Sequence, residues 1–191
     1  MDAAETPRHA ELVRGFVNTR DVEAGTEALA DGPGLSAWLR GQALVGPGTV
    51  ADDGTAALAR DLREALRDVL TAHHDGTSDL VAQDRLDHLA AALPLRVTFP
   101  AGEPTLAPVG ADAVAGLAGV LAAVGAAAAD GSWSRLKVCP ADDCRWAFYD
   151  TSRNRSRTWC SMQVCGNRKK TRAFRARRRS GESVPTHRSG G

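Results

Sequence analysis

The segment "CPADDCRWAFYDTSRNRSRTWCSMQVCGNRKK", Cys139–Lys170, contains all four cysteines of the 191-residue chain. They follow the pattern C-x4-C-x15-C-x4-C and are Cys139, Cys144, Cys160 and Cys165. Two cysteine pairs separated by a loop of this length can bring four thiolates to one tetrahedral ion. Four thiolate ligands leave no open coordination position, so we expect a single Zn²⁺ with a structural role.

Two other interpretations of the cysteines remain open. Met1–Phe16 is acidic and polar, without the apolar core of a secretory signal, so we expect a cytoplasmic protein. Thiols stay reduced in that compartment, which favours a metal site over two disulfides. Thiolates flanked by arginines are also reactive, and a zinc-thiolate redox switch is therefore the second alternative.

The residues around the first cysteine pair predict a β-hairpin. "RLKVC" and "WAFYD" alternate apolar and polar residues, so that Leu136 and Val138 would face Trp146 and Phe148 across the hairpin. A module as short as residues 135–179 has little core of its own, and a metal ion would stabilise it. We therefore predict a zinc-ribbon-like module that consists of a hairpin and a basic helix.

The charge of the chain is distributed unevenly, although the net charge is only +1. Residues 1–134 contain 9 Lys and Arg against 19 Asp and Glu, whereas residues 135–179 contain 14 Lys and Arg against 3 Asp. This asymmetry predicts a polyanionic partner for the C-terminal module alone. Arginine outnumbers lysine there, which suits bidentate contacts to phosphate or guanine.

The basic residues of the module are the candidate nucleic-acid contacts. In a helix, Arg168, Arg172, Arg175 and Arg179 would form one cationic stripe. The full candidate set is Arg153, Arg155, Arg157, Arg168, Lys169, Lys170, Arg172, Arg175, Arg177, Arg178 and Arg179. A solvated basic tail is the simpler alternative. The interleaved aromatic residues could stack on bases, but packing over the metal site is the favoured interpretation.

Residues 1–130 predict a mostly helical domain with a small sheet, so the fold class is α+β. The β-branched and aromatic residues of Glu11–Asp21 indicate a strand. Apolar periodicity, Gly and Pro indicate helices at Leu35–Leu39, from Asp53 to near Gly76, through Leu86–Leu93 up to Pro94, and from Asp112 onward, and a hairpin over 95–109. Residues 111–129 are too weakly apolar for a membrane span. Residues 180–191 read as a disordered tail.

The sequence offers no catalytic motif, and we expect no enzymatic activity. His73 and His74 close a predicted helix, where imidazoles interact favourably with the helix dipole. Asn18, at the end of the predicted first strand, is the single weak candidate for ligand binding. A turn role fits it at least as well.

Residues Arg135–Arg179 resemble the CGNR-type zinc finger, through the four cysteines, "SRN" at 152–154, "WCSM" at 159–162 and "CGNR" at 165–168. The preceding residues are similar to the ABATE domain, on "FVNT" at 16–19 and the "LSAWL" helix. Family members often have an acidic residue at the position of Gly15 and a basic one at that of Thr158. The resemblance implies a bacterial, stress-related transcription regulator. Its finger would bind DNA, and residues 1–130 would sense or regulate.

We therefore expect a transcription regulator that binds DNA through the zinc module and is located at the nucleoid. The same residues allow an RNA- or ribosome-associated protein, and the cysteines allow the redox sensor. A small-molecule effector and a homodimer are compatible with the sequence, whereas membrane association is not expected.

Overall fold

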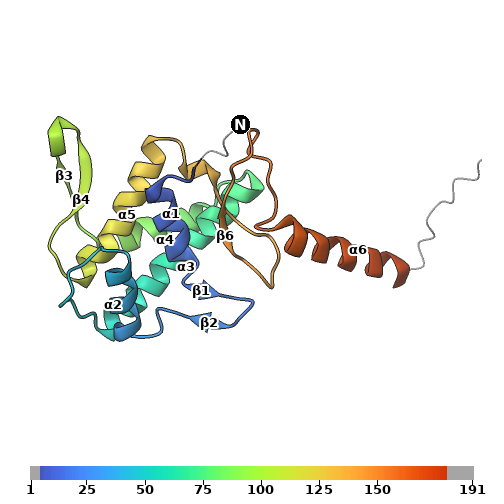
Figure 1. The fold of residues 1–191 in the computed structure, drawn as a ribbon, viewed down its shortest axis with the longest axis horizontal. Helices are drawn as coiled ribbons and strands as arrows, with labels where there is room; N and C mark the ends of the chain where they lie inside the picture. The colour runs from blue at the N-terminus through green and yellow to red at the C-terminus, as the bar shows by residue number, and fades with distance from the viewer. Residues whose placement is uncertain (1–4, 180–191) are drawn as a thin grey trace, which may run out of the picture.

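The computed structural model describes residues 5–179, and the predicted tail at 180–191 lies outside these residues. Figure 1 shows a helical body from which α6 projects at one end and the β3–β4 hairpin at the other. The helices are α1 (Arg8–Val17), α2 (Gly32–Gly41), α3 (Asp53–Asp75), α4 (Leu80–Ala90), α5 (Ala113–Ala129) and α6 (Asn167–Arg179). The strands are β1 (Arg20–Asp21), β2 (Thr26–Glu27), β3 (Leu95–Thr98), β4 (Thr105–Pro108), β5 (Leu136–Val138) and β6 (Ala147–Tyr149). The predicted α+β class, mostly helical with small sheets and a four-cysteine module, is confirmed.

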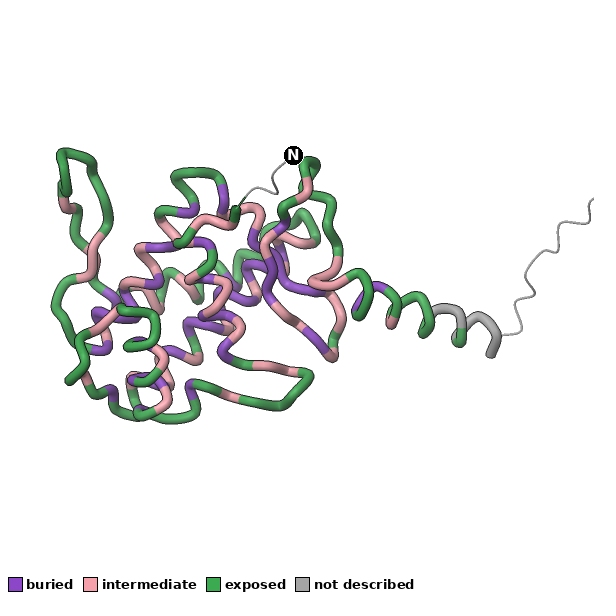
Figure 2. The backbone as a smooth tube through the Cα atoms, viewed as in Figure 1, coloured by how far each residue is buried: buried purple, intermediate pink, exposed green. Residues whose placement is uncertain are grey.

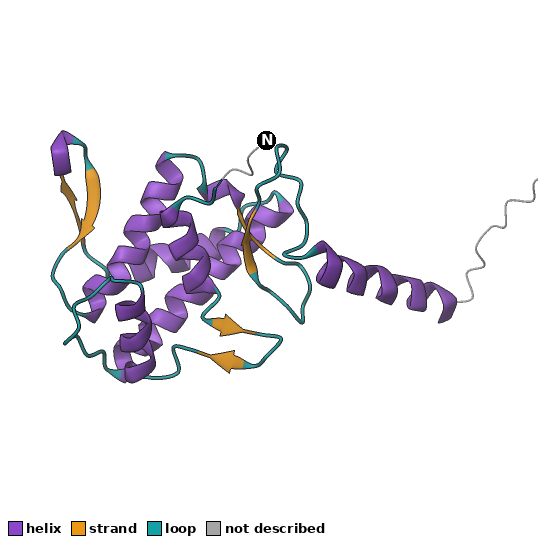
Figure 3. Cartoon of the chain, viewed as in Figure 1, coloured by secondary structure: helices purple, strands orange, loops and turns teal. Residues whose placement is uncertain are grey.

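The strands form three separate two-stranded antiparallel sheets, β1–β2, β3–β4 and β5–β6 (Figure 3). The predicted hairpin over 95–109 is confirmed as β3–β4, with Val97 opposite Leu106. No helix in the described part of the chain has the length and apolar character needed to cross a membrane.

Four helices begin at an aspartate whose carboxylate accepts a hydrogen bond from a backbone N–H of the first turn. The caps are Asp31 for α2, Asp52 for α3, Asp79 for α4 and Asp112 for α5. Each cap satisfies a donor that has no partner inside the helix. The predicted end of α3 is also confirmed, since Gly76 adopts the left-handed conformation with φ of 67° that favours glycine.

The strand expected at Glu11–Asp21 is wrong for most of its length. Arg8–Val17 forms α1, and only Arg20 and Asp21 are extended. Ala10, Val13, Phe16 and Val17 are all buried, which is the spacing of one helix face. Packing of this face against α5 outweighs the β-propensity of valine and phenylalanine.

The core lies between α1, α3 and α5, whose buried faces Figure 2 shows in purple. Close packing of α2 on α5 depends on a residue without a side chain. A Cβ on Gly116 would lie 2.7 Å from a methyl carbon of Val45 and 3.1 Å from one of Leu39. Glycine therefore lets α2 and the loop after it approach the α5 backbone.

The β5–β6 hairpin is part of this core, although it belongs to the predicted zinc module. Leu136, Val138 and Ala147 are buried in the same apolar cluster as the residues of α1, α3 and α5. β5 packs on α3, and β6 packs on α1. The hydrophobic core therefore continues across residue 134, where the composition of the sequence changes.

The predicted register of this hairpin is wrong by one residue. Leu136 and Val138 pair with Tyr149 and Ala147, and Phe148 lies opposite Lys137. A shift of one residue reverses the face of every side chain. As a result one face of the hairpin joins the domain core, and Phe148 on the other face packs against the cysteines.

Two buried arginines of α3, Arg63 and Arg67, bond to the segments that surround this helix. Arg67 is 1% exposed and donates hydrogen bonds to the carbonyls of Val17 at 2.7 Å and Arg145 at 2.6 Å. Arg63, equally buried, forms a bidentate pair with Glu27 of β2. Buried charges need such partners, so these contacts tie α1, β2 and the turn before β6 to one helix.

Candidate metal centre and the basic helix beside it

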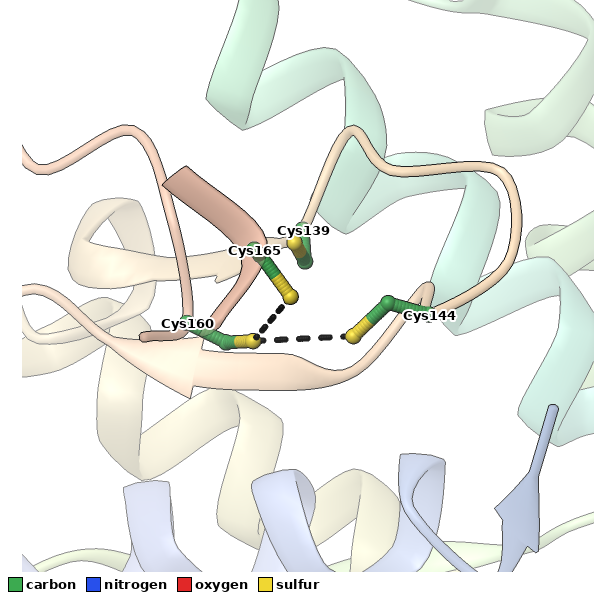
Figure 4. Close-up of side chains that lie close together, drawn as sticks. All are labelled: Cys139, Cys144, Cys160 and Cys165. Atoms are coloured by element: carbon green, nitrogen blue, oxygen red, sulfur yellow. Dashed lines mark hydrogen bonds between the residues drawn. The ribbon is translucent and has the colours of Figure 1, made fainter. Parts of the chain in front are cut away.

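The four cysteines converge from three segments (Figure 4). Cys139 follows β5, Cys144 lies in the turn before β6, and Cys160 and Cys165 lie before and within a π-turn at Met162–Gly166. Their Sγ atoms all lie within 4.8 Å of one another. The Cys144–Cys160 and Cys160–Cys165 sulfur separations are 3.5 Å and 3.6 Å.

These distances fit a tetrahedral zinc site. With Zn–S bonds of about 2.3 Å, the sulfurs at the corners of a tetrahedron lie about 3.8 Å apart. Disulfide bonding requires a sulfur separation of about 2.05 Å, and all four cysteines are free. Four sulfur donors complete the coordination shell, which is typical of a structural ion. The prediction of one structural Zn²⁺ is confirmed.

The surroundings of Cys144 and Cys160 oppose ionisation of these two thiols, and a bound cation would offset that effect. Burial raises the pKa of the Cys144 thiol to about 12, and burial together with the neighbouring sulfurs also raises that of Cys160. Phe148, Trp146 and Trp159 pack around the four sulfurs. These tryptophans therefore cover the metal site, as predicted, and Tyr149 packs against the domain core.

The loop between the two cysteine pairs is ordered around a fully buried aspartate, Asp150. Its carboxylate accepts hydrogen bonds from Lys137 Nζ at 2.8 Å, from the Ser152 hydroxyl and from the backbone of Arg157 at 3.0 Å. Although burial raises it, the bonds from Lys137 and Ser152 hold the pKa of Asp150 below its usual value. The carboxylate therefore stays charged and fixes the path of the loop toward Cys160.

Two of the three candidate arginines in this loop have structural partners. Arg157 donates to the carbonyls of Trp159 and Cys160, and its guanidinium lies 5.1 Å from the Phe148 ring centroid. Arg155 donates to the Ser134 hydroxyl at 2.7 Å. Arg153 is exposed. Arg157 consequently braces the second cysteine pair, whatever else it contacts.

The first turn of α6 is anchored by acidic residues that the charge pattern did not single out. Arg168 donates to Asp143 at 2.9 Å and to Glu23 at 2.6 Å, and Arg172 donates to Asp143 at 2.8 Å. The hydrogen bond from Arg168 holds the pKa of Asp143 below its usual value. Glu23 lies between β1 and β2 in the N-terminal region. The predicted cationic stripe thus begins with two arginines that face carboxylates.

The remaining candidates on α6 differ from these two. Lys169, Lys170 and Arg175 are exposed, and none of them forms an ion pair with a residue between 5 and 179 that the structure describes. Arg177, Arg178 and Arg179 belong to the helix, but their side chains lie outside the described part. α6 therefore presents unpaired positive charge between its two anchored arginines and beyond them.

The structure places Asn18 against β6 rather than at a cavity. Its amide nitrogen donates to the Ala147 carbonyl at 2.9 Å, and its amide oxygen accepts from the Ala147 N–H at 2.8 Å. The side chain thus imitates a neighbouring strand and joins the end of α1 to the hairpin. Asn18 and Ala147 are 129 residues apart, so the local sequence pattern around Asn18 does not reveal this contact.

Both histidines at the end of α3 also contact the zinc module. His73 Nδ1 lies 3.2 Å from the Leu136 carbonyl, and its ring packs edge-on against Trp133. His74 Nε2 lies 3.1 Å from the Thr158 carbonyl. Burial lowers the pKa of His73, so a neutral ring is favoured there. The sequence suggested only a favourable interaction of the two histidines with the helix dipole. It did not predict these contacts, because Leu136 and Thr158 are distant in sequence.

Two family models match the chain. Residues 10–131, more than half of the chain, match ABATE, described as "Putative stress-induced transcription regulator". Residues 135–178 match the CGNR zinc finger. No curated protein matches the chain. The order of the two matches, with the finger on the four converging cysteines, agrees with the resemblance expected from the sequence. The chain therefore belongs to the ABATE family and carries a CGNR zinc finger behind its ABATE domain.

Proposed function

We propose that this protein is a transcription regulator that binds double-stranded DNA through α6 and the metal-bound turn before it. The observation that carries the proposal is the exposed cationic surface of α6, which projects away from an acidic body (Figure 1). Phosphate contacts from Lys and Arg supply most of the non-specific affinity for DNA. The polyanion would thus meet the module and avoid the rest of the molecule.

The dimensions of α6 support duplex DNA as the partner. A helix of 13 residues is about 20 Å long, and the major groove admits an α-helix. Zinc at Cys160 and Cys165 fixes the start of this helix, and Asp143 and Glu23 hold its first turn. Lys169, Lys170 and Arg175, which form no ion pair with a described residue, would then contact phosphates with a defined orientation.

We propose a regulatory rather than a catalytic role for the N-terminal domain. Its β1–β2 turn touches α6 through Glu23, and Asn18 and Arg67 bond to residues on either side of Trp146. A change of shape in the domain, whether caused by an effector or by a second copy, would therefore reach the DNA-binding surface directly.

Fluorescence anisotropy of a labelled random-sequence duplex, titrated with zinc-loaded protein at several salt concentrations, tests the proposal. Each phosphate contact contributes about −0.9 to the slope of log K against log salt. We expect Lys169→Ala/Lys170→Ala to make the slope less steep by about 2. Arg96→Ala on the remote β3–β4 hairpin should leave it unchanged. Absence of duplex binding at low salt would refute the proposal, and stronger binding to a structured RNA competitor would favour RNA instead.

A further inference from the structure

The turn that carries the last two cysteines exposes two apolar side chains beside the basic helix. Met162 is 57% exposed and Val164 is 50% exposed, and Gln163 between them is exposed as well. The Gln163 side chain makes no hydrogen bond to another described residue; its backbone carbonyl accepts one from Asn167. We call Met162–Val164 the knuckle tip. Contiguous exposed apolar surface is typical of a contact site, whereas single exposed apolar residues are common on any protein.

The knuckle tip is held rigidly. The Ser161 carbonyl accepts hydrogen bonds from the N–H groups of Cys165 and Gly166, and the Ser161 hydroxyl accepts one from Val164. The flanking Cys160 and Cys165 are metal ligands. An exposed segment with so many constraints loses little conformational entropy on binding.

Gly166 sets the position of Met162. A Cβ at residue 166 would lie 2.6 Å from the Met162 sulfur and 3.3 Å from an indole carbon of Trp159. The methionine therefore lies across the bare backbone of Gly166 and next to Trp159. Any side chain at residue 166 would displace the end of Met162, so the absence of a side chain there allows the sulfur to occupy this position.

The charges around the knuckle tip identify its partner. Arg168 and Arg172 form ion pairs with Asp143 and Glu23, so their charges already have partners within the molecule. Lys169 and Lys170, in the first turn of α6, are exposed and suited to phosphates. Apolar groups flanked by free cations match a DNA groove, in which methyl groups lie between two phosphate backbones.

We infer that the knuckle tip reads bases in the major groove: Met162 and Val164 contact thymine methyl groups, and the Gln163 amide pairs with adenine. The inference rests on the proposed function, to which it adds sequence preference. Methionine and valine offer apolar contact to the C5-methyl group, and glutamine can bond to N6 and N7 of adenine. The lysines of α6 then supply affinity, and the knuckle tip supplies selection of A·T pairs.

Replacement of thymine by deoxyuridine tests this assignment, since it removes the methyl group and keeps base pairing. Duplexes would first be selected from a random pool by the full-length zinc-loaded protein. We expect A·T pairs at fixed positions in the selected site. The uracil duplex should bind about fourfold more weakly for each contacted thymine methyl group that is removed. The salt slope should stay the same, because methyl contacts release no counterions.

Three variants complete the test. Met162→Ser/Val164→Ser should bind the thymine and uracil duplexes equally well, and Val164→Thr, which keeps the side-chain shape, should show a smaller difference between them. Val81→Ser replaces a valine that is 79% exposed on α4 and should retain the full difference. Zinc content, measured on each variant, shows that the turn is intact.

Two outcomes separate the inference from the proposed function. If wild-type protein binds duplexes with a steep salt slope but without uracil sensitivity or A·T selection, the base-reading role is overturned and DNA binding stands. If it binds no duplex, both are overturned. Uracil sensitivity that persists in an intact Met162→Ser/Val164→Ser variant would also overturn the role of these two side chains.

Discussion

The two halves of the zinc module are held in place by different forces. The β5–β6 hairpin buries Leu136, Val138 and Ala147 in the core of the ABATE domain. The second half, from Cys160 through α6, meets the body through sulfur ligands and ion pairs, and α6 is exposed for most of its described length (Figure 2). The metal therefore connects a segment that the core already orders to one that would lack a fixed position without it.

The zinc module is therefore not an independent unit, because its hairpin belongs to the domain core. A free finger transmits nothing to its neighbour except through a linker. Here the hairpin is a shared element, so a disturbance in α1 or α3 reaches two of the four cysteines through packed side chains. The described residues of the second half, by contrast, contribute no side chain to that core cluster.

Loss of a zinc ligand should separate the halves most clearly. We expect Cys160→Ser to lose its zinc, because the binding free energy of such sites, about 10–16 kcal/mol, depends on all four thiolates. The lysines and arginines of α6 should become more sensitive to trypsin, while the main thermal transition of the body remains. Metal analysis and limited proteolysis measure both effects, with exposed Ser156→Ala as the control. Collapse of the body as well would show that the core does not hold the hairpin.

Truncation of the shared core should act on the whole molecule. Leu136 is completely buried, and Leu136→Ala should lower the free energy of unfolding by about 2–5 kcal/mol. Leu80→Ala, at a residue that is 69% exposed, should change it by less than about 0.5 kcal/mol. Urea denaturation at constant zinc gives both values. A variant that loses zinc affinity and keeps its stability would place Leu136 outside the domain core.

The strand-like contact of Asn18 should have an intermediate effect. Asn18→Asp keeps the shape but faces a carboxylate oxygen toward the Ala147 carbonyl, so the free energy of unfolding should fall by about 1–3 kcal/mol. Asn154→Asp, in the exposed loop, is the matched control. The same denaturation experiment applies. If the response to an effector disappeared with unchanged stability, Asn18 would instead be a ligand-binding residue.

The smallest change is expected from the ion pair between the body and α6. Glu23→Gln removes one carboxylate from Arg168, which keeps its bond to Asp143. Exposed pairs contribute little, so amide hydrogen exchange at residues 168–172 should accelerate by about threefold, with no change in the body. Glu103→Gln in the β3–β4 turn serves as control. Equal exchange rates in wild type and Glu23→Gln would mean that zinc and Asp143 alone fix the helix.

Local rules predicted the helices of the body well, because each depends on residues close in sequence. The aspartate caps at 52 and 112 and Gly76 after α3 act within one turn of their helices, so nearby residues set where α3 and α5 begin and where α3 ends. α1 was mistaken for a strand because its valines and phenylalanine favour β structure locally. The helix becomes visible only from the buried face that it shares with α5.

The metal chemistry and the family of this protein can be read from its residues in order. Four thiolates in two spaced pairs allow one tetrahedral ion, and the asymmetric charge marks the basic module beside it. Folding in three dimensions is needed to show which arginines are ion-paired, which hairpin face enters the core, and that Asn18 bonds to β6. These depend on contacts between residues such as Glu23 and Arg168, 145 positions apart. Such contacts form only when the chain packs, because burial and charge pairing depend on how close two groups are in space and not on their separation in sequence.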